Sequence, residues 1–311
     1  MKAARIVLPG GAGLVGQNLV AQLKQQGYTN LVVLDKHRSN LEILRKMHPD
    51  IVSEYADLAD RGDWERHLAG AAAVVMLQAQ IGGKDFNQFQ RNNIDSTRHV
   101  LDAMKVNGVP YLVHISSSVV ESVANDWYTN TKKEQERMAV ESGIPNVVLR
   151  PTLMFGWFDR KHLGWLSRFM QKVPVFPIPG HGRYMRQPLY AGDFSNIIVS
   201  CIEKGITGSF NISGREQVDY IDIIREIKRA IRSRTIILNI PYGLFHTLLS
   251  VWAVFDRDPP FTTQQLSALV ARDEFEVIDW PDIFGVTPTR FAQAIDATFN
   301  DPNYSQVVLD F

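Results

Sequence analysis

The sequence of 311 residues is poor in cysteine, has no long apolar run and shows no excess of either charge. Its one cysteine, Cys201, cannot form an internal disulfide, which favours a reducing compartment and a cytoplasmic location. Basic and acidic residues both number 33, so no overall field recruits nucleic acid. No apolar run reaches spanning length, and no transmembrane segment is expected. A strand-like run begins so near Met1 that no cleavable signal peptide is expected.

The composition is that of an ordinary globular protein, with 45% apolar and 21% charged residues. The length allows one large or two smaller domains. Cys201 lies in the apolar run 197–202, which favours buried packing over a nucleophilic role. No metal is expected.

Three glycines at a G-x-x-G-x-x-G spacing are the most informative feature. Gly10, Gly13 and Gly16 follow a short β-branched run and open an amphipathic stretch. Such glycines allow a tight turn, a close approach of backbone N–H groups to a pyrophosphate, and close helix–sheet packing. A second apolar run ends in Asp35, whose carboxylate can bind a ribose 2′-hydroxyl. The predicted dinucleotide-binding residues of this segment are Gly10, Gly13, Leu14, Val15, Gly16 and Asp35.

Asp35 also bears on the choice of cofactor. A carboxylate there repels a 2′-phosphate, which favours NAD over NADP. Lys36, His37 and Arg38 follow at once, and Arg38 could turn toward a phosphate, so NADP stays open as the alternative.

Apolar runs alternate with helical patterns through the first half of the chain. Strands are expected over residues 6–8, 31–34, 51–55, 73–77, 111–115 and 147–149, and helices over 14–25, 40–47, 64–67, 86–106 and 132–142. This alternation predicts an α/β fold, a Rossmann-type doubly wound parallel sheet with helices on both faces.

The pattern changes after Arg150-Pro151. The proline-rich segment 173–180 reads as a loop, followed by a helix over 193–202, a strand over 209–212 and a helix over 218–231. We therefore expect a dinucleotide-binding domain over 1–152, to which 188–212 returns. Residues 153–187 and 213–311 are expected to form a smaller, mostly helical substrate-binding lobe.

Residues 242–255 form a strongly apolar stretch with helical spacing. A core or lobe-interface helix is the favoured interpretation. Because apolar residues cover so much of its circumference, docking on a membrane surface stays open as the alternative.

A second group of residues is typical of proton-transfer chemistry. Three serines, 116–118, follow the strand-like run that ends at residue 115, and Tyr128 stands four residues before Lys132. On a helix this spacing puts both side chains on one face, where the ammonium is expected to lower the pKa of the phenol. Tyr128 would then act as general acid/base, with Ser118 holding the reacting oxygen.

These motifs together resemble the extended short-chain dehydrogenase/reductases, the NAD-dependent epimerase/dehydratase group, over essentially the whole chain. The resemblance implies that Asn93 supports an active-site water and Lys132, and that Lys132 also holds the nicotinamide ribose. It further implies that Asp57 and Leu58 border the adenine of the cofactor, that Leu77 and Ala79 line the cofactor cleft, and that Pro151 and Thr152 border the nicotinamide. The sequence departs from the family pattern at Pro9 and Met76, and the segment from Ser118 to Tyr128 is shorter than in typical sugar epimerases.

Three C-terminal landmarks, residues 186–193, 259–265 and 284–289, resemble the branch that contains the 39 kDa accessory subunit of respiratory complex I. In nucleotide-sugar enzymes an arginine at the Arg186 position meets a substrate phosphate, but a surface cation is an equal alternative.

The sequence thus predicts an NAD(P)-dependent oxidoreductase or epimerase that transfers hydride at a carbon bearing a hydroxyl or carbonyl. The alternatives are a non-catalytic nucleotide-binding subunit and a reductase of a hydrophobic ketone. A small-molecule substrate is expected, and a homodimer stays open. Substrate contacts are expected in the second lobe, at Trp157, His162, Arg183, Tyr184 and Arg186.

Overall fold

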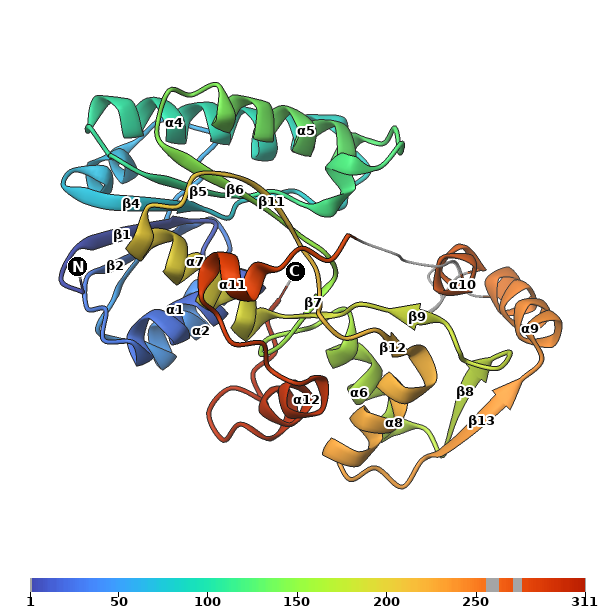
Figure 1. The fold of residues 1–311 in the computed structure, drawn as a ribbon. Coiled ribbons are helices and arrows are strands. Elements are labelled where there is room, and N and C mark those ends of the chain that lie inside the picture. The colour runs from blue at the N-terminus through green and yellow to red at the C-terminus, as the bar shows by residue number, and fades with distance from the viewer. Residues whose placement is uncertain (1, 256–262, 271–275, 311) are drawn as a thin grey trace.

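The computed structural model describes residues 2–255, 263–270 and 276–310 (Figure 1). Its large domain is built on a seven-stranded sheet in the order β11-β6-β5-β4-β1-β2-β3, with every neighbouring pair parallel. The strands are β1 (Arg5–Pro9), β2 (Leu31–Asp35), β3 (Val52–Tyr55), β4 (Ala71–Met76), β5 (Leu112–Ile115), β6 (Asn146–Pro151) and β11 (Gly208–Ile212). The strand order reverses at β1 and β4, which confirms the predicted doubly wound sheet.

Helices cover both faces of this sheet. Figure 1 shows α4 and α5 over one face, and α1, α2 and α7 over the other. The helical segments here are α1 (Leu14–Gln25), α2 (Arg38–Met47), η1 (Asp63–Leu68), α3 (Phe86–Phe89), η2 (Gln90–Asp95), α4 (Ser96–Val106), η3 (Ser118–Glu121), α5 (Trp127–Val140) and α7 (Ala191–Lys204). Because both faces are covered, central strands such as β2 are buried along their whole length.

The rest of the chain forms a smaller lobe with its own apolar core, in which α6, α8 and α12 pack around β8. Its strands are β7 (Met154–Phe155), β8 (Val175–Pro179), β9 (Met185–Arg186), β10 (Leu189–Tyr190), β12 (Val218–Asp219) and β13 (Ile236–Ile240). Its helices are α6 (Leu163–Lys172), α8 (Tyr220–Ala230), α9 (Tyr242–Phe255), α10 (Thr263–Val270) and α12 (Phe291–Asn300). The short helix α11 (Trp280–Phe284) packs instead against α7, and its Trp280 and Phe284 are buried in the core of the large domain. The exact domain boundaries stay a prediction.

Two expectations about local structure are wrong. The proline-rich segment 173–180 is not a loop, because β8 occupies residues 175–179 and pairs with β13, a strand that the sequence did not suggest. Prolines are tolerated there because, within the described residues, β8 pairs with β13 alone and has an unpaired side. The helix expected over 86–106 is interrupted by the π-helical turn η2, which no periodicity of apolar residues marks.

Within the described residues, no helix has both the length and the apolar content to cross a membrane. Of the sequence landmark 259–265, residues 259–262 lie outside the described residues.

The turn from β1 into α1 is closely packed at Gly16. A Cβ atom at Gly16 would lie 2.3 Å from the carbonyl oxygen of Gly11, which no real contact allows. A Cβ atom at Gly13 would meet nothing nearer than the carbonyl oxygen of Gly10 at 3.7 Å, and the φ of Gly13 is −79°, which alanine adopts readily. Close packing therefore requires glycine at position 16, whereas the fold itself has room for a larger residue at position 13.

We expect Gly16→Ala to destabilise the fold by about 1–3 kcal/mol, because α1 must move away from the turn. Gly13→Ala is the matched control and should change the unfolding free energy by less than about 1 kcal/mol. Urea unfolding followed by circular dichroism measures both. Equal midpoints for the two variants would contradict the packing argument.

Candidate functional site

The N-terminus of α1 is open toward the carboxyl edge of the sheet. Gly13 is its N-cap residue, and no side chain caps the first turn. The N–H groups of a helix N-terminus attract anions, above all phosphate. The open space beside Gly13 gives such a group room to approach the backbone.

Asp35 braces the same turn from the end of β2. Its carboxylate accepts hydrogen bonds from the backbone N–H of Ala12, at 2.9 Å, and of His37, at 3.0 Å. Asp35 is thereby held beside the glycine turn, where the sequence analysis expects a ribose.

Two of the cations that follow Asp35 have partners of their own. The Lys36 ammonium donates to the side-chain oxygen of Asn92, and the Arg38 guanidinium lies 3.8 Å from the centre of the Tyr55 ring. Arg38 is thus engaged in a cation–π contact rather than turned toward the ribose end of the site. This arrangement favours a ribose with a free 2′-hydroxyl.

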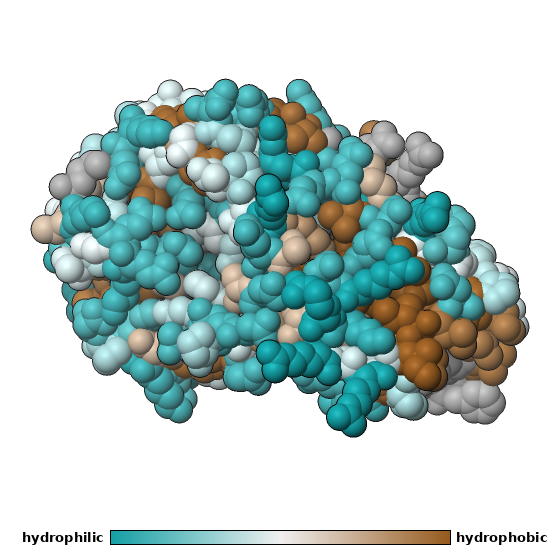
Figure 2. Space-filling view, turned by 60° about the horizontal axis from the view of Figure 1, so that its bottom comes forward, coloured by the Kyte–Doolittle hydropathy of each residue, from teal (hydrophilic) through white to brown (hydrophobic). Residues whose placement is uncertain are grey.

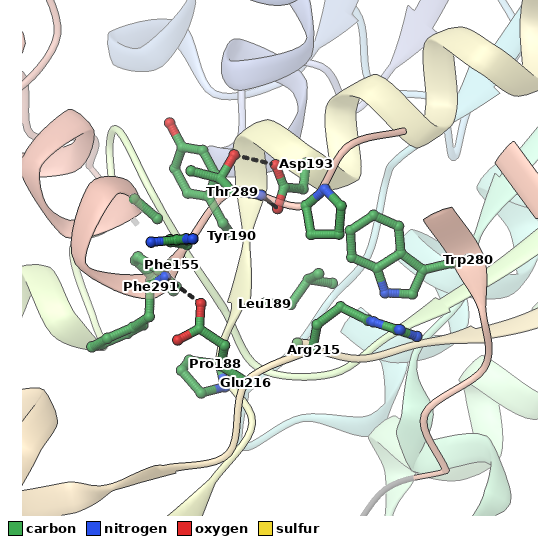
Figure 3. Close-up of a pocket in the computed structure, with 14 residues that line it drawn as sticks. Phe155, Pro188, Leu189, Tyr190, Asp193, Arg215, Glu216, Trp280, Thr289 and Phe291 are labelled. Atoms are coloured by element: carbon green, nitrogen blue, oxygen red, sulfur yellow. Dashed lines mark hydrogen bonds between the residues drawn. The ribbon is translucent and has the colours of Figure 1, made fainter. Parts of the chain in front are cut away.

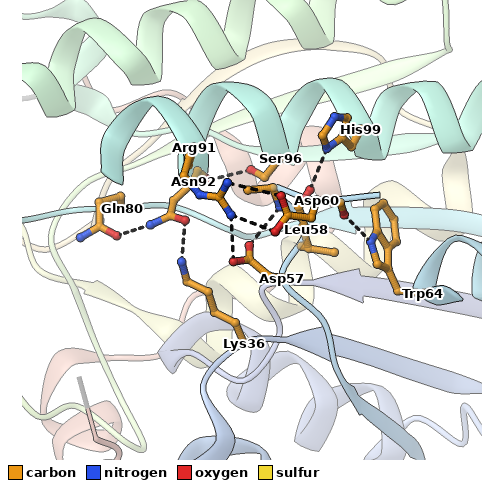
Figure 4. Close-up of polar contacts among 11 residues, drawn as sticks. Lys36, Asp57, Leu58, Asp60, Trp64, Gln80, Arg91, Asn92, Ser96 and His99 are labelled. Atoms are coloured by element: carbon orange, nitrogen blue, oxygen red, sulfur yellow. Dashed lines mark hydrogen bonds and ion pairs between the residues drawn. The ribbon is translucent and has the colours of Figure 1, made fainter. Parts of the chain in front are cut away.

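The loop after β3 is tied to the π-helix η2. Figure 4 shows Arg91 pointing at Asp57 and Asp60, with Nη2 distances of 3.3 and 3.0 Å to their carboxylate oxygens. The adjoining Leu58 is buried, and its carbonyl faces His99. The structure therefore fixes the two predicted adenine neighbours, Asp57 and Leu58, through side chains of η2 and α4.

Gln78 is a site residue that the sequence analysis did not single out. It follows β4, between the predicted Leu77 and Ala79, and a Cβ atom at Gly10 would lie 2.4 Å from its backbone nitrogen. Gly10 has a φ of +74°, so glycine is required there on both counts. Neither polar atom of the Gln78 side-chain amide has a hydrogen-bond partner among the described residues, although both are buried. Such an amide fits a ligand that supplies the missing partners.

Asn93 joins the end of β4 to α5. Its side chain accepts a hydrogen bond from the Gln80 N–H at 2.6 Å and donates to the Thr131 hydroxyl at 2.8 Å. It lies in the π-helical turn and is fully buried. The structure thus gives Asn93 a positioning role one residue away from Lys132; its support of a water molecule stays a prediction.

Tyr128 lies in the first turn of α5, where Asp126 caps the helix by accepting from the Thr129 N–H at 2.9 Å. A hydrogen bond from Ser117 lowers the pKa of Tyr128, but burial has the larger effect, and the net direction is upward. The expected lowering by Lys132 is therefore wrong for this structure. The serine that the structure brings to the phenol is Ser117, and the role of Ser118, at the start of η3, stays a prediction.

Lys132 explains why the expectation failed. Its side chain is fully buried, and its ammonium donates to the carbonyl oxygen of Ile115 at 2.9 Å, at the end of β5. Burial lowers the pKa of Lys132 to about 7, and the nearby charge of Glu136 partly opposes that shift. The lysine is poised to change its protonation state near neutral pH rather than to act as a permanent cation.

A buried carboxylate, Glu136, connects this lysine to the neighbouring strands. It accepts from the Ser116 hydroxyl at 2.6 Å and forms an ion pair with Arg150. Neither Glu136 nor Ser116 was expected as a site residue, since a Glu one turn beyond a Lys on a helix reads as a surface pair. The close fit of α5 against β5 and β6 is what buries them.

Beyond β6, Pro151 and Thr152 lie at the junction of the domains. Both are buried, and the Thr152 N–H donates to the Ile212 carbonyl at 2.9 Å. They thus line up with the ends of β6 and β11, where the resemblance places the nicotinamide. Cys201, in contrast, is buried in the core on α7, which confirms a packing role.

The predicted substrate residues are occupied by other contacts. Trp157 is buried, donates its indole N–H to the Ala297 carbonyl at 2.8 Å and packs against Tyr304. Tyr184 donates its hydroxyl to the Pro179 carbonyl at 3.0 Å. The Arg186 guanidinium donates to the carbonyl oxygens of Met185 and Leu269. These contacts give all three residues a structural role, and substrate binding by them stays a prediction.

A cavity of about 140 Å³ lies where two of the sequence landmarks meet (Figure 3). Asp193 on α7 accepts hydrogen bonds from the Thr289 N–H and hydroxyl, at 2.9 and 2.6 Å, and Glu216 accepts from the Phe291 N–H. The cavity is smaller than the usual site for a small-molecule ligand, and the predicted catalytic and cofactor-binding residues do not line it. Landmarks 186–193 and 284–289 therefore hold the C-terminal segment against α7.

Comparisons with known proteins agree with this arrangement. The model of the NAD dependent epimerase/dehydratase family matches residues 6–213. The chain is 23% identical to a UDP-glucose 4-epimerase of Vibrio cholerae, over 81% of this chain and 84% of that protein. It is also 23% identical to a decarboxylating sterol-4-alpha-carboxylate 3-dehydrogenase of Saccharomyces cerevisiae, over 92% of this chain and 94% of that protein. The crystal structure of a UDP-glucuronic acid 4-epimerase from Bacillus cereus in complex with NAD has the same fold. Its TM-score is 0.69 at 22% identity, and the match covers 94% of this chain and 96% of that one.

We expect Lys132→Met to raise the stability of the protein near pH 7, because it removes a buried ammonium while Glu136 keeps Arg150 as its partner. In the wild type the unfolded chain holds more protons than the folded one between pH of about 7 and 10.5, so the contribution of Lys132 to stability rises with pH across that window. The variant should lose this rise. Urea unfolding at several pH values measures it.

Lys133→Met is the matched control, because Lys133 is exposed on the same helix. Its free energy of unfolding should follow the wild-type pH dependence. A Lys132→Met protein with that same dependence would show that folding does not lower the pKa of Lys132.

Proposed function

The chain belongs to the NAD-dependent epimerase/dehydratase family, and from this premise we propose that it is an oxidoreductase or epimerase in which Tyr128 moves the proton of a substrate hydroxyl. The observation that carries the proposal is the position of Tyr128 on α5, one turn before the buried Lys132 and hydrogen-bonded to Ser117, one of the serines that follow β5. A protein that only binds a nucleotide has no need of a buried lysine, whose desolvation is costly.

The residues present fit NAD. The uncapped N-terminus of α1 and the space beside Gly13 suit the pyrophosphate, and Asp35 suits a ribose hydroxyl. Gln78 lies against the same turn, and its side-chain amide, which has no partner in the part of the chain that the structure describes, offers both a donor and an acceptor. Lys132, Pro151 and Thr152 would border the nicotinamide end. When bound, NAD accepts or returns the hydride of the reacting carbon.

The chain itself supplies the proton chemistry. The phenol of Tyr128 takes the proton from the substrate hydroxyl as the carbonyl forms, and it returns a proton in the reverse direction. Ser117 or Ser118 holds the substrate oxygen by a hydrogen bond. Lys132 is a positioning residue, which supports Tyr128 by bringing a charge close to it once its amine is protonated.

The substrate is proposed in two classes. A nucleotide sugar is the first, and it is supported by the names of relatives such as the UDP-glucose 4-epimerase. A hydrophobic ketone or alcohol is the second. It is supported by the sterol dehydrogenase relative. It is also supported by Arg186, because the guanidinium expected to bind a substrate phosphate donates instead to two backbone carbonyls. The single cysteine supports a cytoplasmic location. A homodimer and membership of the complex I accessory branch stay predictions.

Replacing the phenol alone tests the catalytic assignment. We expect Tyr128→Phe to lower kcat about 100-fold or more, the usual contribution of a positioned acid/base, while the Kd for NAD stays unchanged. Turnover is followed at the absorbance band of reduced nicotinamide, with nucleotide sugars and hydrophobic ketones as substrates.

Tyr28→Phe is the control. Tyr28 follows the C-terminal end of α1, away from the phosphate-binding turn, and donates its hydroxyl to Glu203 on α7. The kcat of this variant should therefore keep its wild-type value. If Tyr128→Phe turned over as fast as Tyr28→Phe, the chain would not use this tyrosine, and a nucleotide-binding role without catalysis would replace the proposal.

Cofactor preference is tested separately. We expect calorimetry to give a lower Kd for NAD than for NADP, because Asp35 opposes a 2′-phosphate. Arg38→Ala should leave both values within about 2-fold, since Arg38 stacks on Tyr55. A selective loss of NADP affinity in this variant would show that Arg38 turns toward the phosphate.

A further inference from the structure

The far end of the small lobe exposes large apolar side chains. Six of them are between 39% and 63% exposed, and we call them the lobe tip: Val175, Ile236, Leu238, Leu244, Leu248 and Val251. Figure 2 shows apolar side chains gathered at this end of the molecule, bordered by hydrophilic ones. Single exposed leucines are common on proteins, but a group of this kind marks an interaction surface.

The strand pair β8/β13 accounts for one part of the lobe tip. Ile237 packs into the core of the small lobe, so Ile236 and Leu238, one residue to either side, point to the opposite face of the sheet. Val175 is the register partner of Ile236 on β8, and it is exposed as well. The sheet thus has a buried face and an apolar face that nothing covers within the described residues.

Helix α9 continues this surface. It begins two residues after β13 ends, and its sequence contains no Asp, Glu, Lys or Arg. Leu244, Leu248 and Val251 stand at the i, i+4, i+7 spacing of one helix face and are all more than half exposed. A core or lobe-interface helix would bury this face, so the favoured interpretation of 242–255 from the sequence is wrong for these residues.

Basic side chains lie beside the lobe tip. Arg225, Lys228, Arg229, Arg232 and Ser233 line a shallow groove together with Ile237 of β13. Arg225 and Arg229 form ion pairs, whereas none of the ion pairs found among the described residues involves Lys228, Arg232 or Arg234. Residues 227–255 contain no acidic residue at all. In a chain with no net charge, this is a local concentration of positive charge next to an apolar face.

We propose that the lobe tip docks on an anionic phospholipid surface, with Lys228, Arg232 and Arg234 facing the headgroups. Apolar side chains that enter the headgroup boundary, next to cations that attract anionic lipid, are the two components of interfacial binding. Helix α9 has 14 residues and is therefore about 21 Å long, shorter than the roughly 30 Å hydrocarbon core, so it lies along the surface.

A second copy of the chain fits this face less well. A two-fold contact through the lobe tip would bring together two surfaces that each carry Lys228, Arg232 and Arg234. Like charges brought together in this way disfavour association, whereas an anionic bilayer is complementary to both components of the face.

The proposal is tested by vesicle flotation of the full-length protein. We expect binding to vesicles that contain about one-third phosphatidylglycerol, little binding to pure phosphatidylcholine, and weakened binding at high salt. Lys228→Gln/Arg232→Gln should weaken binding roughly 10- to 30-fold, at about 5-fold per cation. Leu244→Ser/Leu248→Ser should weaken it by about 10-fold or more.

The control carries the same kinds of change on the large domain. Lys105→Gln/Val106→Ser alters one cation and one strongly exposed valine at the end of α4, and it should bind as the wild type does. Of these side chains only Lys228 is half-buried and the others are exposed, so unchanged thermal unfolding confirms that each variant is folded.

Three results would overturn the proposal. The first is a wild-type protein that fails to bind anionic vesicles. The second is an equal effect of the control and lobe-tip variants. The third is a dimer, seen by light scattering, that Leu244→Ser/Leu248→Ser dissociates, because the lobe tip would then join two copies of the chain. None of these readouts depends on NAD or on Tyr128, so the proposed activity stands or fails separately.

Discussion

The tight contact between the β1–α1 turn and the end of β4 is the constraint on which the site depends. Gly10 takes a positive φ, and a side chain there would collide with the backbone of Gln78. This closeness fixes the segment after β4. Gln80, two residues further on, is bonded to Asn93, and Asn93 is bonded to Thr131 on α5. The phosphate-binding turn and the helix that carries Tyr128 and Lys132 are thus positioned by one chain of contacts.

Buried ionisable groups give α5 its chemical character. Lys132 faces the Ile115 carbonyl, while Glu136, one turn further, is neutralised by Arg150 and accepts from Ser116. His114, on β5, is fully buried; burial and the nearby Lys132 hold its pKa well below the ordinary value. A lysine in such surroundings loses its proton easily, so its charge depends on what binds beside it. The burial of Lys132 and the groups around it therefore decide its charge, which its spacing from Tyr128 along the helix does not.

The small lobe has a different organisation. Its core is closed by α6, α8 and α12, but β8 and β13 form a separate sheet, and no described residue covers the apolar face of that sheet. The cations beside that face and the uncharged helix α9 give it a mixed apolar and basic surface. This part of the chain is therefore a candidate for contacts outside the active site.

The sequence by itself determined the doubly wound parallel sheet, the helices on both of its faces, and the turn at Gly10, Gly13 and Gly16. These features follow from local rules: a buried strand must be apolar throughout, and only glycine tolerates a positive φ and backbone contact without strain. The same rules located Asp35 at a strand end, as well as Tyr128 and Lys132 one turn apart.

Only the tertiary structure decided what these side chains touch. Four features depend on residues distant in sequence: the burial of Lys132, the approach of Ser117 to Tyr128, the bond from Arg186 to Leu269, and the lack of a partner, among the described residues, for the side-chain amide of Gln78. The same holds for β8, whose prolines suggested a loop, and for α9, whose apolar residues suggested a core helix. Burial and hydrogen bonding depend on which elements pack together, and periodicity along the chain carries no record of that.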